Sequence, residues 1–95
     1  MNEDTKKITY LEIRISGRVQ GVGFRYFVKR QADKLGLKGF CKNEGDESVL
    51  VFSSGEKENQ DKFLEKLQRG PLFARVSKLE VKEVLEFQYE NFKIK

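Results

Sequence analysis

The order in which the hydrophobic pattern changes along the chain constrains the fold more than any other feature. From residue 9 to residue 16, apolar and polar residues alternate, as they do in a strand with one buried face. From residue 24 to residue 34 the apolar residues recur at helical spacing, and Gly36 is a typical residue for the helix C-terminus. The pattern therefore predicts a first strand that ends at Gly17, followed by a helix.

The same change from alternation to helical spacing occurs again further along the chain. The elements predicted after the first helix are strands at 37–43 and 48–53, a helix at 56–69, and strands at 78–82 and 92–94. A polar turn at 44–47 joins two of these strands, and Gly70 and Pro71 stop the second helix. This order is typical of the split βαβ or ferredoxin-like α+β sandwich. We expect an antiparallel sheet of four to five strands with two helices on one face.

A chain of 95 residues has room for one domain with one modest core. Residues 1–8 are mostly polar and are predicted to form a flexible tail, which leaves 9–95 as the domain. The chain has no apolar run of membrane-spanning length and no N-terminal stretch of signal-peptide type, so we expect a cytoplasmic protein without a membrane partner. Nineteen basic and 15 acidic residues give a net charge of +4, which mildly favours anionic ligands.

The absence of histidine excludes many kinds of catalytic site. The chain contains no histidine and a single cysteine, Cys41. Ser-His and Cys-His systems and the usual zinc and haem ligand sets are therefore excluded, and we predict neither a metal site nor a cofactor. Cys41 lies in an alternating strand with no base nearby in the sequence, so core packing is preferred to a nucleophilic role.

The segment between the first strand and the first helix reads GRVQGVGFR, at residues 17–25. A loop that enters a helix N-terminus presents unpaired amides, and the helix dipole adds partial positive charge, so the place attracts an anion. Gly21 and Gly23 let the backbone turn back and approach a ligand, and the Arg25 guanidinium can close over the same anion. The spacing fits neither a dinucleotide-binding nor a Walker fingerprint. Plainer explanations stay open, namely a tight turn for the glycines and a solvated helix position for Arg25.

A family resemblance favours the functional interpretation. The run GRVQGVGFR, followed after one helix by GFCKN at 39–43 and by Gly70-Pro71 after the second helix, resembles the acylphosphatase family. The resemblance covers residues 10 to 95. Members of that family have the ferredoxin-like fold and hydrolyse the carboxyl-phosphate bond of acyl phosphates. The products are a carboxylate and inorganic phosphate, and no metal or cofactor takes part.

The resemblance also implies which residues form the site. Arg25 matches the phosphate-binding arginine of the family, and Asn43 matches the asparagine that orients the attacking water. A neutral amide suits that task because it accepts a hydrogen bond from water and donates one to the substrate. Phosphoryl transfer depends mainly on positioning and charge stabilisation, so a protein without histidine can catalyse it. The backbone amides implied to hold the phosphate are those of Gln20, Gly21, Val22, Gly23, Phe24 and Arg25.

One departure from the family pattern lies in the turn after Asn43. The family usually has Asp-Gly there, whereas in this chain Asp46 is followed by Glu47. Either Glu47 takes a left-handed backbone conformation, which costs a non-glycine residue about 1 kcal/mol, or Gly45 takes that conformation instead. The shape of the turn beside Asn43 is therefore left open.

The leading hypothesis is a monomeric enzyme that acts on a small acyl phosphate. The alternative is a non-catalytic anion-binding or partner-binding module, because the family's domain also occurs inside larger carbamoyl-transfer maturation proteins. The presence of both Arg25 and Asn43 favours the enzyme. Leu50 and Phe52 are expected on the sheet face that the helices leave open, as a small apolar patch or a weak self-association surface. RNA binding there would need several aromatic platforms with basic neighbours, so no nucleic-acid partner is expected.

Overall fold

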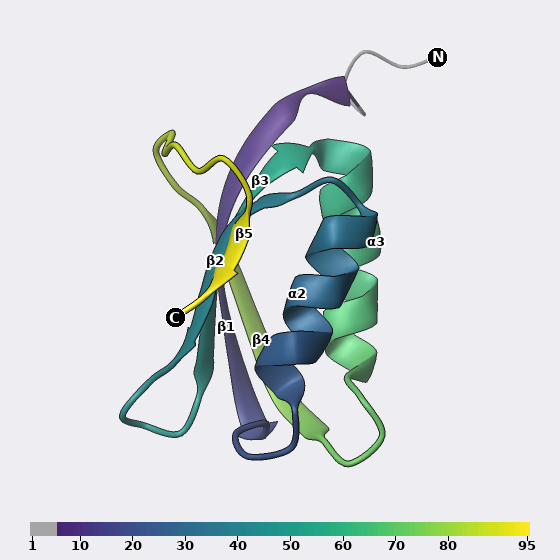
Figure 1. The fold of residues 1–95 in the computed structure, drawn as a ribbon, viewed down its shortest axis with the longest axis vertical. Coiled ribbons are helices and arrows are strands. Elements are labelled where there is room, and N and C mark those ends of the chain that lie inside the picture. The colour runs from purple at the N-terminus through teal and green to yellow at the C-terminus, as the bar shows by residue number, and fades with distance from the viewer. Residues whose placement is uncertain (1–5) are drawn as a thin grey trace.

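The computed structural model describes residues 6–95, which form a sheet covered on one face by two helices (Figure 1). In chain order the elements are β1 (Ile8–Arg18), α2 (Phe24–Lys34), β2 (Lys38–Asn43), β3 (Val49–Glu56), α3 (Lys57–Arg69), β4 (Arg75–Glu83) and β5 (Phe92–Ile94). The strand order is β4-β1-β3-β2-β5. The predicted ferredoxin-like fold with both helices on one face is confirmed.

The sheet is mixed, whereas the prediction was an antiparallel sheet. The pairs β1–β3, β1–β4 and β2–β3 are antiparallel, but β5 pairs with β2 in parallel. The segment 84–91 causes this arrangement because it reverses the chain after β4. The following strand β5 then runs opposite to β4 and in the same direction as β2 (Figure 1).

Local patterns explain the bounds of α2, whereas β1, β3 and β4 extend beyond their predicted ranges. The helix α2 spans the predicted residues, and Gly36 takes a φ of 67° just beyond its end. The prediction that Gly17 ends the first strand is wrong, because β1 continues to Arg18. Its register with β4 shifts between Ser16 and Gly17, where Ser77 of β4 is left without a partner, and the pairing continues beyond this irregularity.

The hydrophobic core lies between the sheet and the two helices. Val19 and Phe24, each 1% exposed, belong to this core and lie on either side of the loop at 20–23. Burying a large apolar side chain stabilises a protein by about 1.5–3 kcal/mol, so both ends of the loop are firmly anchored. The other core residues are Leu11, Ile13, Ile15, Val28, Ala32, Leu37, Cys41, Val49, Val51, Phe63, Leu67 and Phe92.

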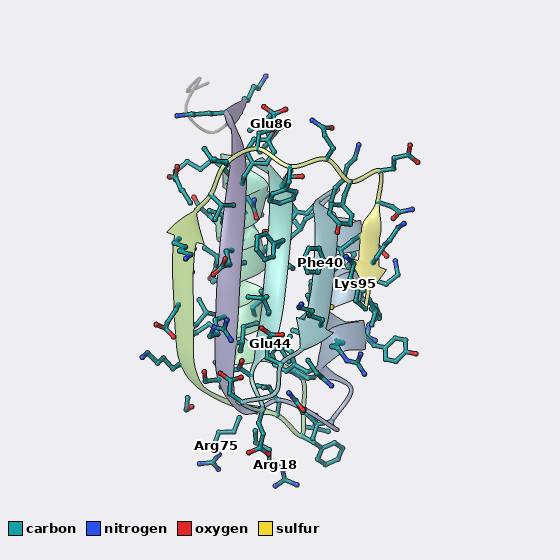
Figure 2. The ribbon with its side chains drawn as sticks, turned by 90° about the vertical axis from the view of Figure 1, so that its left-hand side faces the viewer. Arg18, Phe40, Glu44, Arg75, Glu86 and Lys95 are labelled. Atoms are coloured by element: carbon teal, nitrogen blue, oxygen red, sulfur yellow. The ribbon has the colours of Figure 1, made fainter. Side chains whose placement is uncertain are left out.

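The sheet face opposite the helices is partly covered by the chain itself. Leu50 is only 8% exposed, and the Phe52 ring stacks on Phe40 at a centroid distance of 5.0 Å. Phe87, from the segment after β4, meets Phe52 edge-on at 5.7 Å. The Lys95 ammonium lies 4.2 Å from the centroid of the Phe40 ring (Figure 2). These contacts occupy much of the surface that was predicted as an apolar patch or a self-association surface.

The start of β1 is tied to the first residue of α3. The Lys57 N–H donates to the Lys7 carbonyl at 2.9 Å, and Ile8 is the first residue of β1. Lys7 and Ile8, the last two residues of the predicted tail, are therefore attached to α3 and β1, respectively. Residues 1–5 of that tail lie outside the described residues.

Candidate active site

The loop between β1 and α2 presents its backbone amides at the N-terminus of α2. Gly21 and Gly23 have φ values of 74° and 76°, which other residues rarely adopt. A Cβ atom at either position would meet no protein atom within 4 Å, so the backbone conformation, and not crowding, requires glycine. In the described chain the Phe27 N–H donates to the Gly23 carbonyl at 3.1 Å, and the amides of residues 20 to 25 precede this bond without a backbone acceptor.

The helix start is not neutralised by the side chains around it. Gly23 is the N-cap of α2 and provides no side-chain cap, and the first turn contains no acidic residue. A helix N-terminus carries a partial charge of about +0.5, and Arg25 in the first turn adds a full positive charge. The loop and the helix start are therefore suited to an anion.

Arg25 reaches from α2 to the end of β5. Its Nη1 donates to the main-chain oxygen of Lys95 at 2.9 Å, and the Lys95 N–H donates to the Cys41 carbonyl at 2.8 Å. The side chain therefore lies beside β2 near Cys41. Among the described residues no Asp or Glu side chain pairs with the guanidinium, and a guanidinium has five N–H donors, so donors are left for a ligand. This contact with Lys95 was not predicted, because no local pattern links residues 70 positions apart.

Asn43 is the last residue of β2 and lies on the helix-facing side of the sheet. It pairs with Val49, which pairs with Ile15, and both partners are fully buried in the core under the helices. Cys41 occupies the same face two residues earlier, or about 6.6 Å along the strand. The side chain of Asn43 is exposed and has no hydrogen-bond partner among the described residues. It is therefore able to bind water or a ligand.

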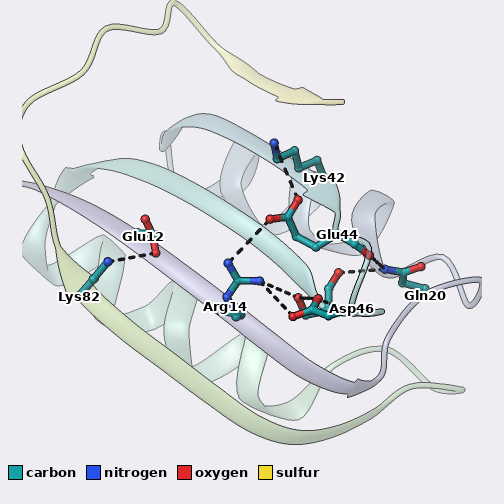
Figure 3. A network of polar contacts seen from close by, with 8 residues as sticks. Glu12, Arg14, Gln20, Lys42, Glu44, Asp46 and Lys82 are labelled. Carbon is teal, nitrogen blue, oxygen red and sulfur yellow. Dashed lines mark hydrogen bonds and ion pairs between the residues drawn. The ribbon is translucent and has the colours of Figure 1, made fainter.

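The Gln20 side chain joins the loop to the turn that follows Asn43. Its Nε2 donates to the carbonyls of Glu44 and Ser48, both at 2.9 Å (Figure 3). The sequence hypothesis used only the backbone amide of Gln20, so this role of its side chain was missed. The only sign of this role in the sequence was a glutamine side chain close to the two glycines of the loop.

Two contacts therefore bracket Asn43. On one side the Cys41 thiol donates to the Arg25 carbonyl at 3.6 Å, and on the other Gln20 donates to the Glu44 carbonyl. Both contacts tie the segment at 20–25 to β2 and its turn. The structure thus brings the predicted site residues together at one end of the sheet.

Cys41 itself is a core residue, as predicted. Its side chain is fully buried, and burial raises the pKa of the thiol to about 12, although the nearby charges of Arg25 and Lys29 act to lower it. The thiol therefore stays protonated at neutral pH and is a poor nucleophile.

The turn at 44–48 contains a strained residue. Glu47 takes a φ of 70°, whereas Gly45 is outside the left-handed region, so the alternative that assigned this conformation to Gly45 is wrong. The Glu44 N–H donates to the Ser48 carbonyl at 2.9 Å and closes the turn. Asp46 Oδ1 accepts from the Ser48 Oγ–H at 2.5 Å and the Ser48 N–H at 3.1 Å. These bonds hold the pKa of Asp46 below its usual range.

Replacing Glu47 with glycine is expected to stabilise the protein. Relief of the left-handed conformation is worth about 1–2 kcal/mol, and the greater freedom of glycine in the unfolded chain offsets about 0.5–1 kcal/mol of it. The midpoint of thermal unfolding should rise by a few degrees. Glu47→Ala is the control because it removes the carboxylate but keeps the strain. An equal gain in both variants would show that charge, and not backbone conformation, is responsible.

Residues 6–95 do not meet the requirements of a metal site or of a membrane-spanning helix. No group of three or more His, Cys, Asp or Glu residues in this part is placed to hold a metal ion. No helix in it is long and apolar enough to cross a membrane.

Comparison with known proteins identifies the family. The model of the acylphosphatase family matches residues 11–94, which is nearly all of the chain. The chain belongs to the acylphosphatase family. An acylphosphatase from Archaeoglobus fulgidus is 48% identical over 84 residues, which cover 88% of this chain and 94% of that relative. The structure of an acylphosphatase from Coxiella burnetii is 33% identical with a TM-score of 0.90, and the match covers 100% of both chains.

A larger protein contains the same fold. Full-length HypF in its phosphate- and nucleotide-bound form is 34% identical with a TM-score of 0.87, but the match covers 93% of this chain and only 12% of that chain. The match to the Archaeoglobus acylphosphatase, in contrast, covers 94% of that relative. The predicted family and the predicted enzyme, an acylphosphatase that hydrolyses acyl phosphates, are confirmed, and the non-catalytic alternative is disfavoured.

Proposed function

We propose that this acylphosphatase holds the phosphoryl group of a small acyl phosphate with the amides of residues 20 to 25 and the Arg25 guanidinium, while Asn43 orients the attacking water. The observation that carries the proposal is the position of Asn43 between the two contacts that tie the loop and α2 to β2. Its unpartnered amide faces the same side of the sheet as the start of α2. In this proposal the guanidinium binds a phosphate at the helix start, and the amide of Asn43 holds the water that attacks it.

The reaction needs little chemistry from side chains. The water oxygen attacks phosphorus, the bond between phosphorus and the carboxyl oxygen breaks, and its electron pair leaves with the carboxylate. An acyl phosphate dianion and water thus give a carboxylate and dihydrogen phosphate, and both protons of the water remain on the phosphate product. The carboxylate leaves without a proton, so no general acid is required. Preorganised donors stabilise the charge that develops on the phosphoryl oxygens.

The cytoplasmic location, the monomeric state and the lack of a nucleic-acid partner remain predictions from the sequence.

The assay that tests this function is turnover of acetyl phosphate. We expect hydrolysis that continues in excess chelator, and competitive inhibition by inorganic phosphate, because the product occupies the same amides and guanidinium. A simple alkyl phosphate ester is the matched control and should not turn over, since its alkoxide leaving group is far more basic than a carboxylate. The proposal would be contradicted by a folded protein that leaves acetyl phosphate intact, or by activity that is lost in chelator and restored by magnesium.

A further inference from the structure

The turn at 44–48 directly follows Asn43, so the shape of the turn fixes the position of that residue. The turn holds Glu47 in a left-handed conformation, with a φ of 70°. Two backbone bonds close it, from Glu44 N–H to Ser48 at 2.9 Å and from Glu47 N–H to Glu44 at 3.1 Å. A strained turn of this kind keeps its shape only where its surroundings hold it.

Arg14 on β1 holds the turn from the open face of the sheet. Its Nη1 donates to Ser48 Oγ at 3.0 Å, and the same nitrogen lies 3.5 Å from Asp46 Oδ2. Its Nη2 lies 3.7 Å from Glu44 Oε1 (Figure 3). One guanidinium therefore reaches three of the five residues of the turn, which a planar fork of donors can do and an ammonium cannot.

The loop at 20–25, called the phosphate loop from here on, contacts the same turn through the Gln20 side chain. Figure 3 shows Gln20 and Arg14 reaching the turn from different directions, and both end on Glu44 and Ser48. Gln20 binds their carbonyls, whereas Arg14 binds their side chains. The turn is thus fixed to β1 through Arg14 and to the loop at 20–25 through Gln20.

Arg14 does not share the face of Asn43. Arg14 pairs with Leu50, which pairs with Lys42, so these residues lie on one face of the sheet. Asn43 is the next residue after Lys42 and points to the opposite face. Arg14 therefore does not contact Asn43 directly, and its side-chain hydrogen bond and ion pairs within residues 6–95 are all with the turn.

We propose that Arg14 is a positioning residue for the hydrolysis: by holding the turn at 44–48 it fixes Asn43 relative to the phosphate loop. The inference rests on the proposed role of Asn43. The Arg14 side chain is one-third exposed, and ion pairs that solvent reaches add little to stability. A displacement of about 1 Å in a reacting group, in contrast, lowers a rate by up to about a hundredfold. Loss of Arg14 should therefore affect turnover much more than folding.

The first test compares Arg14→Gln with Lys82→Gln. Lys82 forms an ion pair that Figure 3 draws on the same sheet face but away from the turn, with its ammonium 3.6 Å from Glu12, so this variant controls for the loss of one positive charge. For Arg14→Gln we expect kcat for acetyl phosphate to fall between about tenfold and about a hundredfold. The inhibition constant for phosphate and the melting temperature should stay nearly unchanged. Lys82→Gln should behave like the parent protein. Unchanged kcat in Arg14→Gln, or an equal loss in Lys82→Gln, would overturn the inference.

The second test combines Arg14→Gln with Asn43→Ala. If Arg14 acts through Asn43, the double variant should have the kcat of Asn43→Ala alone, and multiplied losses would contradict this route. Should Arg14→Gln fail to fold, Asp46→Ala replaces it. The Asp46 side chain is 63% exposed, and its loss removes one contact of the turn with Arg14 together with the two bonds from Ser48. That variant must then reproduce the selective fall in kcat, and normal turnover would reject the inference. Normal turnover in Asn43→Ala would reject the proposed role of Asn43 as well as the inference. Reduced turnover in Asn43→Ala together with normal turnover in Arg14→Gln would reject only the inference.

Discussion

Replacing Arg25 with lysine is expected to lower kcat/KM for acetyl phosphate by at least about a hundredfold. A charge-assisted hydrogen bond contributes about 1.5–3 kcal/mol, and each 1.4 kcal/mol is about tenfold in rate, so the loss of a two-point contact has a large effect. The guanidinium donates to Lys95 at 2.9 Å through one nitrogen and keeps other donors for the phosphoryl group. An ammonium supplies a single point charge and cannot make both contacts in the same geometry.

The measurement is steady-state kinetics of Arg25→Lys beside Arg30→Lys. Arg30 is an exposed residue of the same helix, so its exchange tests a conservative substitution in α2 away from the loop. Substrate binding and turnover should both weaken in Arg25→Lys and stay normal in Arg30→Lys. Near-normal kinetics in Arg25→Lys would show that this side chain does not clamp the phosphate.

Replacing Asn43 with alanine is expected to reduce turnover without weakening phosphate binding. Removal of one preorganised polar group from an active site costs about 3 kcal/mol, or about a hundredfold in rate. Arg25 and the loop amides stay in place because Val19 and Phe24 anchor the loop independently of Asn43. The loss should therefore appear mainly in kcat.

Asn43→Asp is the sharper variant. It keeps the shape of the side chain but places a negative charge close to an anionic phosphoryl group, so both binding and turnover should weaken. Lys38→Ala, at the other end of β2, controls for a substitution in the same strand. Folding is checked by circular dichroism. Preserved activity in Asn43→Asp would mean that a carboxylate at this position acts as a general base, and would contradict the assignment of a neutral water-orienting amide.

The local pattern was sufficient to predict the elements that position the site. Helix α2 begins at Phe24 because the helical spacing of apolar residues begins there, directly after Gly23. The position of the anion-binding loop follows from that boundary. The end of β1 and the start of β4 were harder to predict, because their pairing continues past a register shift at Ser77, beyond the alternating stretch.

The contacts that fix the site geometry could not be predicted in the same way. Gln20 and Glu44 are 24 positions apart, Arg14 and Ser48 are 34 apart, and Arg25 and Lys95 are 70 apart. Such partners are set by the order and register of strands, which local periodicity does not contain. The resemblance to the family named the residues of the site but not the residues that support them.

The most direct test of the proposed division of roles is the inhibition constant for inorganic phosphate in three proteins: the parent, Arg25→Lys and Asn43→Ala. If Arg25 binds the phosphoryl group and Asn43 places the water, the constant should rise by about tenfold or more in Arg25→Lys, the loss of one charge-assisted hydrogen bond. It should stay within about twofold of the parent value in Asn43→Ala, because kcat is the quantity that this variant changes. An equal rise in both variants, or no rise in Arg25→Lys, would contradict the account.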